Sequence, residues 1–211
     1  MSDPIPHQDI SYYEAWKTDL AVETVWHNPD TDFLAILAPH GGDIETQTDT
    51  AAVEMYKKMP NNSTSLWMFQ GFDSTETNDN KAKRQYHVTS SEISSKQFPA
   101  IGEIDDVGFQ YCVSFHIKRN AEVFEIGGLA DKGIREDVAE TLVGTTGGEW
   151  NAITDHDEGE YMAVSEQNIT NRLTDDSQSG VQIEMPGRAA KIYRKSIAED
   201  LAEYFTKLYR R

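Results

Sequence analysis

A histidine and a glutamate lie close together in the segment His40-Gly41-Gly42-Asp43-Ile44-Glu45. The segment follows an apolar run at 33–38 and precedes a helical pattern that begins at Thr46, and its two glycines permit a tight turn beside the histidine. Zinc takes histidine nitrogen and carboxylate oxygen as ligands, so this segment is a candidate metal site. The alternative is an ordinary turn in which Glu45 stabilises the dipole of the following helix.

A second histidine, His116, ends the apolar run at 109–116. Alternation along a strand places Cys112, Ser114 and His116 on one face of this run. A histidine at the end of a buried strand is well placed to be a metal ligand, although a lone histidine there is also explained by simple hydrogen bonding. Cys112 is interpreted as a small core residue.

Glu184 interrupts the apolar segment at 181–185. A carboxylate inside an apolar strand is costly unless it is paired or used in chemistry, and the alternative is a strand-edge glutamate that faces water. Arg172, which follows Asn171, is of the type that clamps a carboxylate with two hydrogen bonds; the alternative is a surface arginine.

The elements that would position these residues alternate between strand and helix patterns. Helices are expected at 46–58, 131–143 and 189–209, and polar loops at 71–83 and 174–179. The pattern predicts a single α/β domain over residues 1–211, with a mixed central β-sheet flanked by helices and with roughly residues 1–20 peripheral. In such a sheet, ligands bind beyond the carboxyl ends of the strands. The expected strands are apolar runs bounded by turn residues, namely 21–26, 33–38, 66–69, 86–89, 109–116, 123–126 and 181–185.

The amino-acid composition limits the kinds of partner that the protein can bind. The 19 basic and 36 acidic residues give a net charge of −17, which disfavours a nucleic-acid backbone or an anionic membrane as partner. The single cysteine cannot form an internal disulfide. The N-terminus lacks the basic start and apolar run of a signal peptide, so we expect cytoplasmic synthesis, with release by lysis or transport on a virus particle.

The excess of acidic residues also indicates adaptation to high salt, with ordinary solubility as the alternative interpretation. We expect the midpoint of thermal unfolding to rise from low to molar salt, because screening weakens the repulsion among carboxylates. Thermal unfolding at the two salt levels measures this. A midpoint that stays flat or falls would remove the argument for a salt-adapted source.

Taken together and in order, these motifs resemble one family, the poly-γ-glutamate hydrolases of bacteriophages and their relatives, which are similar to zinc carboxypeptidases. The resemblance implies a zinc-carboxypeptidase-like fold with His40, Glu45 and His116 as zinc ligands and Glu184 as the general base and acid. It also implies that His87, Asn171 and Arg172 hold the substrate. The matching pieces run from about residue 33 to residue 190: His40–Glu45, 86–90, 113–116, 127–129, 168–172 and 180–184.

The resemblance predicts a zinc-dependent hydrolase of amide bonds, in particular of γ-glutamyl bonds in a polyanionic peptide-like substrate. Lys118, Arg119, Arg172 and Arg188 would supply a local basic cleft despite the negative net charge, and Arg188 is also predicted to bind the substrate. The carboxypeptidase spacing H-x-x-E would select Asp43, whereas the longer H-G-G-x-I-E of the relatives selects Glu45, which we favour. Two alternatives stay open: another zinc amidase or deacylase on the same fold, and a non-enzymatic structural or attachment component of a virus particle.

Overall fold

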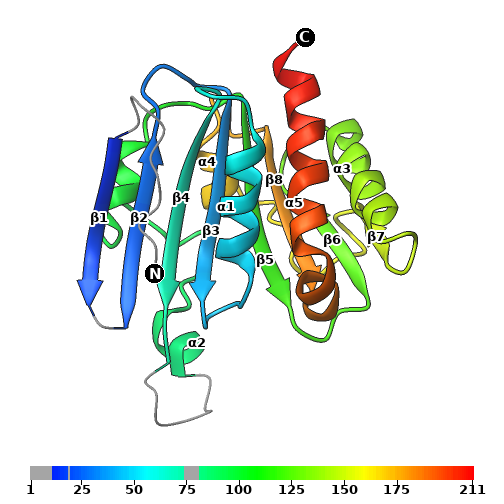
Figure 1. Ribbon diagram of the computed structural model, residues 1–211, viewed down its shortest axis with the longest axis horizontal. Helices are drawn as coiled ribbons and strands as arrows, with labels where there is room; N and C mark the ends of the chain where they lie inside the picture. Colours follow the sequence, from blue (N-terminus) through cyan, green and yellow to red (C-terminus); the bar gives the residue numbers. More distant parts are fainter. Residues whose placement is uncertain (1–10, 19, 74–80) are drawn as a thin grey trace.

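The computed structural model describes residues 11–18, 20–73 and 81–211, and within these ranges the chain forms one eight-stranded mixed sheet in a single α/β domain (Figure 1). The order of the strands across the sheet is β1-β2-β4-β3-β5-β8-β6-β7. The strands are β1 (Ser11–Thr18), β2 (Ala21–His27), β3 (Leu34–Gly42), β4 (Thr64–Gly71), β5 (Tyr111–Lys118), β6 (Val123–Gly127), β7 (Asn151–Ile153) and β8 (Gly180–Pro186). The helices are α1 (Thr48–Lys58), α2 (Lys81–Tyr86), α3 (Lys132–Thr145), α4 (Ile169–Arg172) and α5 (Gly187–Tyr209), with a 3₁₀ turn, η1, at Pro99–Glu103.

The centre of the sheet is parallel. β4, β3, β5 and β8 run in one direction, whereas β2 and β6 run against their neighbours β4 and β8. The carboxyl ends of β3, β5 and β8 therefore meet at one edge of the sheet, where the candidate ligands and Glu184 were expected.

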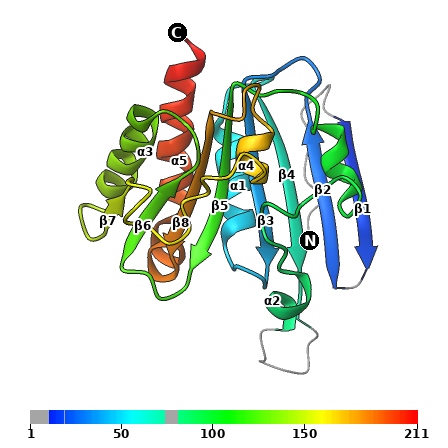
Figure 2. The same cartoon turned by 180° about the vertical axis from the view of Figure 1, so that it is seen from behind.

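Each face of the sheet carries its own apolar core. Helices α1, α3 and α5 cover one face (Figure 1), and α4, η1 and long connections lie over the other (Figure 2). Buried strand residues alternate between the two cores: Leu34 and Ile36 of β3 pack towards the helices, whereas Ala35 and Leu37 pack towards the other face. Because both faces are covered, the residues of the central strands β3, β4, β5 and β8 are buried along almost their whole length.

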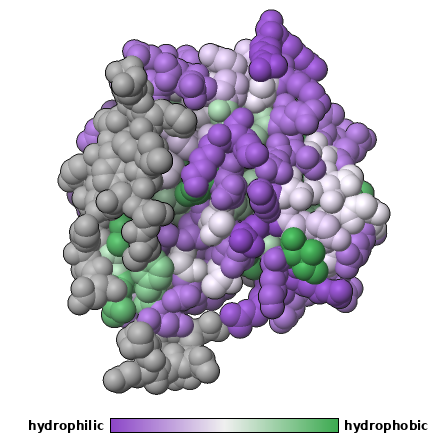
Figure 3. All heavy atoms as spheres, in the orientation of Figure 1, coloured by the Kyte–Doolittle hydropathy of each residue, from purple (hydrophilic) through white to green (hydrophobic). Residues whose placement is uncertain are grey.

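Helix α5 covers the larger of the two apolar cores with one face and presents the other face to solvent. Ile197, Leu201 and Phe205 are buried at helical spacing, and the solvent side of the helix is mostly polar, although Ile192 and Tyr209 are exposed on it. The space-filling view of this side shows mostly hydrophilic residues in its coloured part (Figure 3). No helix among the described residues is long and apolar enough to cross a membrane.

Most predicted elements are present with shifted ends, but the strand predicted at 86–89 is wrong. Tyr86 is the last residue of α2, and the three residues after it are irregular. The apolar character reflects packing: the Tyr86 ring lies 6.2 Å from that of Phe69 and covers Gly71. Of the loop predicted at 71–83, residues 74–80 lie outside the described part and residues 81–83 are helical. β1, β7, α2, α4 and η1 were not predicted.

Candidate metal centre and active site

The segment between β3 and α1 turns His40 and Glu45 towards each other. The backbone N–H of Glu45 donates to the carbonyl of His40 at 2.8 Å, which closes the turn. Gly42 has a φ of +69°, and a Cβ there would lie 2.5 Å from the carbonyl oxygen of Gly71, so only glycine fits. α1 begins at Thr48, after Gln47 in a left-handed conformation, so Glu45 precedes the helix. The Asp43 carboxylate accepts from the N–H of Asp73, and Glu45 supplies the carboxylate beside His40.

His40 presents a bare nitrogen to this carboxylate. Its Nε2 lies 2.8 Å from the carbonyl oxygen of Val88, which can only accept, so Nε2 carries the hydrogen. Its Nδ1 is buried, has no hydrogen-bond partner among the described residues and lies 3.2 Å from Glu45 Oε1. Two electron-pair donors that face each other in a buried site are the arrangement that a cation between them would stabilise. A backbone carbonyl that fixes the ring is also typical of ligating histidines.

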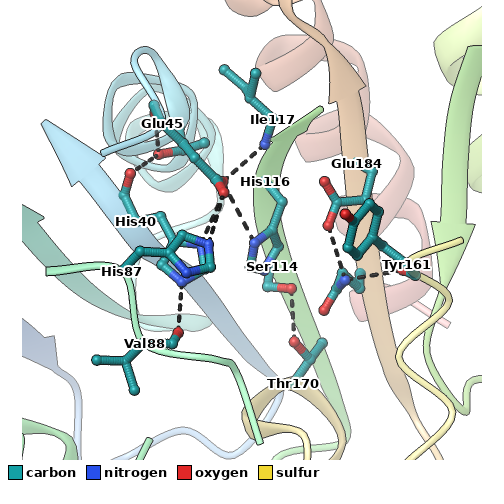
Figure 4. Close-up of polar contacts among 12 residues, drawn as sticks. His40, Glu45, His87, Val88, Ser114, His116, Ile117, Tyr161, Thr170 and Glu184 are labelled. Carbon is teal, nitrogen blue, oxygen red and sulfur yellow. Dashed lines mark hydrogen bonds and ion pairs between the residues drawn. The ribbon is translucent and has the colours of Figure 1, made fainter. Parts of the chain in front are cut away.

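Two further histidines approach the same carboxylate (Figure 4). The Nδ1 of His116, at the end of β5, lies 3.6 Å from Glu45 Oε2, and the Nε2 of His87 lies 3.4 Å from Glu45 Oε1. His87 is stacked on His40, with ring centroids 4.0 Å apart. The potential ligand atoms of His40, Glu45 and His87 all lie within 4.8 Å of one another. The side chains thus offer two candidates, His116 and His87, for a third protein ligand.

Electrostatics set the charge states around Glu45. Burial acts to raise the pKa of Glu45, but the imidazoles of His40, His116 and His87 outweigh it and hold this pKa well below its ordinary value. Burial lowers the pKa of His116, which favours the neutral imidazole that binds metals. A carboxylate together with imidazole nitrogens is a donor set that fits zinc.

Glu184 lies in the same cavity, which has a volume of about 580 Å³ and is also lined by His40, Glu45, His87 and His116. It is the direct neighbour of His116 across β5 and β8. Burial, together with the carboxylates of Glu45 and Glu125, raises the pKa of Glu184 well above its ordinary value. Gln182 donates to Glu184 Oε1 at 3.1 Å. The alternative interpretation, a strand-edge glutamate that faces water, does not describe this residue, because its side chain is buried.

Three residues predicted to hold the substrate do not line this cavity. Arg172 donates to the carbonyl of Ile93 and forms an ion pair with Asp105 at 2.9 Å. Asn171 is fully buried, where its side chain bonds three backbone groups. Arg188 is 77% exposed on the surface of α5. Each of these side chains is therefore committed to a structural contact or faces bulk solvent, and its role in substrate binding stays a prediction.

His87 does line the cavity, as do three cations: Lys83, Lys118 and Arg119. Lys118 is bound by two carboxylates, those of Glu125 at 2.7 Å and Glu160 at 2.8 Å. No such ion pair is found for Lys83 in the part of the chain that the structure describes. Sequence reasoning missed Lys83, Glu125 and Gln182, and for Lys83 the only available signal was a basic residue after a polar segment.

The fold and this site together indicate the structural class of the protein. The fold matches two solved metallo-carboxypeptidases. That from Pseudomonas aeruginosa, in complex with (2-guanidinoethylmercapto)succinic acid, has a TM-score of 0.54 at 13% identity, with 95% of this chain and 66% of that chain covered. That from Burkholderia cenocepacia has a TM-score of 0.55 at 8% identity, covering 96% and 66%. The protein therefore has a metallocarboxypeptidase-like fold, with a His–Glu cluster where the central parallel strands end.

Two further comparisons show the protein family within this structural class. The structure of a bacteriophage poly-gamma-glutamate hydrolase matches with a TM-score of 0.65 and 22% identity, covering 92% of this chain and 90% of that one. The sequence pattern of the poly-gamma-glutamate hydrolase family matches residues 10–206, so the chain belongs to this family of hydrolases. No curated protein matches the chain in sequence.

Proposed function

We propose that this protein is a zinc-dependent hydrolase of γ-glutamyl amide bonds in poly-γ-glutamate. The observation that carries the proposal is the buried, unbonded Nδ1 of His40 beside the Glu45 carboxylate, in the same cavity as Glu184. Family membership supports the hydrolase class and the choice of substrate.

His40 and Glu45 would hold the ion together with His116, while His87 would contact the substrate. A zinc ion held there would lower the pKa of a water molecule and polarise the carbonyl of the scissile amide. The raised pKa of Glu184 makes this carboxylate a stronger base than an ordinary glutamate. It is therefore suited to take a proton from the attacking water and to pass it to the nitrogen of the leaving amine. The hydrogen bond from Gln182 orients one of its oxygens.

The substrate would be recognised as an anion. Each γ-linked glutamate carries a free carboxylate, and Lys83 is a cavity cation for which the described residues provide no ion pair. Lys118 is already balanced by Glu125 and Glu160, so it contributes little attraction. We therefore assign the recognition of a substrate carboxylate to Lys83, in place of Arg172 and Arg188. Absence of nucleic-acid and membrane partners, and association with a virus particle, stay predictions.

Substitution Lys83→Gln is expected to raise KM for poly-γ-glutamate roughly 3–10-fold, because it removes one partly exposed charge contact of about 1 kcal/mol. The increase should shrink in high salt, which screens the same contact. Steady-state kinetics at two salt concentrations measure both effects. Lys57→Gln is the matched control, because it makes the same charge change in the last turn of α1. Equal KM values for the parent and Lys83→Gln would contradict the assignment.

The function is tested by incubating zinc-loaded protein with poly-γ-glutamate, α-linked polyglutamate and cell-wall peptides, followed by detection of new amines. We expect new amines from poly-γ-glutamate, and none after treatment with a chelator. Release from cell-wall peptides alone would indicate another zinc amidase. A zinc-loaded protein that cleaves none of the three would instead support a non-enzymatic role.

A further inference from the structure

One wall of the cavity is irregular backbone. Residues 159–164, named here the wall segment, line the cavity beside Glu184, although they form neither helix nor strand. Ala163 has a φ of +48°, a left-handed conformation that is costly for a residue with a side chain. Such strain persists only where the surroundings hold the backbone in place.

Neighbouring residues hold the wall segment in place through contacts with its consecutive backbone carbonyl groups. The N–H of Gly128 donates to the carbonyl of Met162 at 2.8 Å, and a Cβ on Gly127 would lie 2.3 Å from the same oxygen. Asn171 donates to the carbonyl of Ala163 at 2.7 Å. Asn171, which the sequence predicted to bind substrate, thus fixes the wall of the cavity.

Glu125 makes the central contact with the wall segment. Its side chain is buried, and its Oε2 accepts from the backbone N–H groups of Glu160 and Tyr161 at 3.2 and 3.0 Å. Its Oε1 accepts from Lys118 Nζ at 2.7 Å. Lys118 also lies 5.1 Å from the centroid of the Tyr161 ring. One buried carboxylate therefore fixes both the backbone and, through Lys118, the side chain of Tyr161.

Gln182 connects the wall segment to Glu184. Gln182 donates through Nε2 both to the carbonyl of Tyr161 and to Glu184 Oε1, each at 3.1 Å. Its Oε1 accepts from Asn168, which fixes the orientation of the amide. Glu125 and Glu184 are direct neighbours across β6 and β8, so their side chains lie on the same face of the sheet. Movement of Tyr161 would therefore disturb the hydrogen bond that orients Glu184.

We infer that Glu125 is a positioning residue for hydrolysis: it holds the wall segment, and through Tyr161 and Gln182 it holds the orientation of Glu184. The kinetic part of this inference rests on the proposed function, whereas its structural part does not. A carboxylate is needed at this position because Glu125 accepts from backbone N–H groups at one oxygen and from an ammonium at the other. Glutamine would turn an NH₂ group towards one of these donors.

The test combines Glu125→Gln with hydrogen–deuterium exchange of the peptide that covers the wall segment, and with kinetics. We expect about tenfold faster exchange in this peptide, unchanged exchange in β3, β5 and β8, and unchanged zinc content. With an active parent, we expect kcat to fall by about tenfold and KM by less than threefold in either direction. Glu160→Gln is the control, because it removes the exposed partner of the same Lys118 and should leave exchange of the wall segment near that of the parent.

A second variant, Gln182→Met, keeps the side-chain length and decides the question if Glu125→Gln does not fold. If both fold, the two effects on kcat should be non-additive in the double variant, because both residues act on Glu184 through Tyr161. Unchanged exchange of the wall segment, exchange that rises uniformly over the whole sheet, or additive kinetic effects would each overturn the inference. An inactive parent that still shows the local change in exchange would count against the proposed function alone.

Discussion

Glu184→Gln is expected to lower turnover by at least about 10²-fold while the fold and the bound zinc are retained. Glutamine keeps the size and shape of the side chain but cannot accept the proton of the attacking water. Glu184 is not placed as a metal ligand, since it lies on the far side of His116 from Glu45 (Figure 4). Steady-state kinetics with poly-γ-glutamate and metal analysis of the same preparation measure the two parts of the prediction.

The raised pKa of Glu184 provides an independent readout of its burial. Because its pKa in the folded protein is raised, the free energy of unfolding falls as the pH rises from the ordinary glutamate value, about 4.3, through the raised value. In metal-free protein at neutral pH, Glu184→Gln should therefore raise the midpoint of thermal unfolding. The gain should shrink as the pH falls towards about 4.3.

Two outcomes would contradict this role of Glu184. If Glu184→Gln hydrolyses the substrate at a rate near that of the parent, the carboxypeptidase-like mechanism is wrong, and family membership supports the hydrolase class alone. If the variant instead loses its zinc, Glu184 contributes to metal binding. His40→Ala is the matched control, because it should lose zinc and activity together.

The central strands and the residues at their ends could be predicted from local sequence. The strands that carry His40, His116 and Glu184 are rich in apolar residues, and a histidine or glutamate within or at the end of such a strand stands out. Parallel pairing then brings these ends to one edge of the sheet, wherever the other elements lie. The local sequence was therefore enough to predict that these three side chains lie near one another, but not the distances between them.

The substrate contacts could not be predicted in this way, because they depend on partners far away in the chain. Arg172 is suited to bind a substrate carboxylate, but in the folded protein it forms an ion pair with Asp105. Asn171 has the amide of a binding residue, but it is buried and bonded to the backbone near Ala163. The partners of Arg172 and the Leu129 partner of Asn171 are far away in the chain, and the nearer partners of Asn171, Ala163 and Ser165, are backbone carbonyls of an irregular segment whose path the local sequence does not predict.

The last prediction concerns the third protein ligand of the metal, for which the structure offers His116 and His87. His116 is buried at the end of a central strand, and its Nε2 has no hydrogen-bond partner among the described residues. His87 is 34% exposed and lies on the irregular segment that follows α2. A rigid, buried and neutral imidazole loses less freedom on binding a metal than an exposed one on an irregular segment, so we expect His116 to be the ligand.

His116→Ala is accordingly expected to lose bound zinc, with a decrease in affinity greater than the 10–100-fold typical of residues that only support a ligand. His87→Ala should remain zinc-loaded, with a higher KM, because it removes a side chain from the wall of the cavity without removing a ligand. Zinc content after dialysis against a competing chelator separates the two cases, and His40→Ala, which removes the best-oriented nitrogen, serves as the reference for complete loss. The reverse pattern, with zinc kept in His116→Ala and lost in His87→Ala, would make the cluster of His40, Glu45 and His87 the metal site. It would leave His116 as a buried neighbour of Glu45.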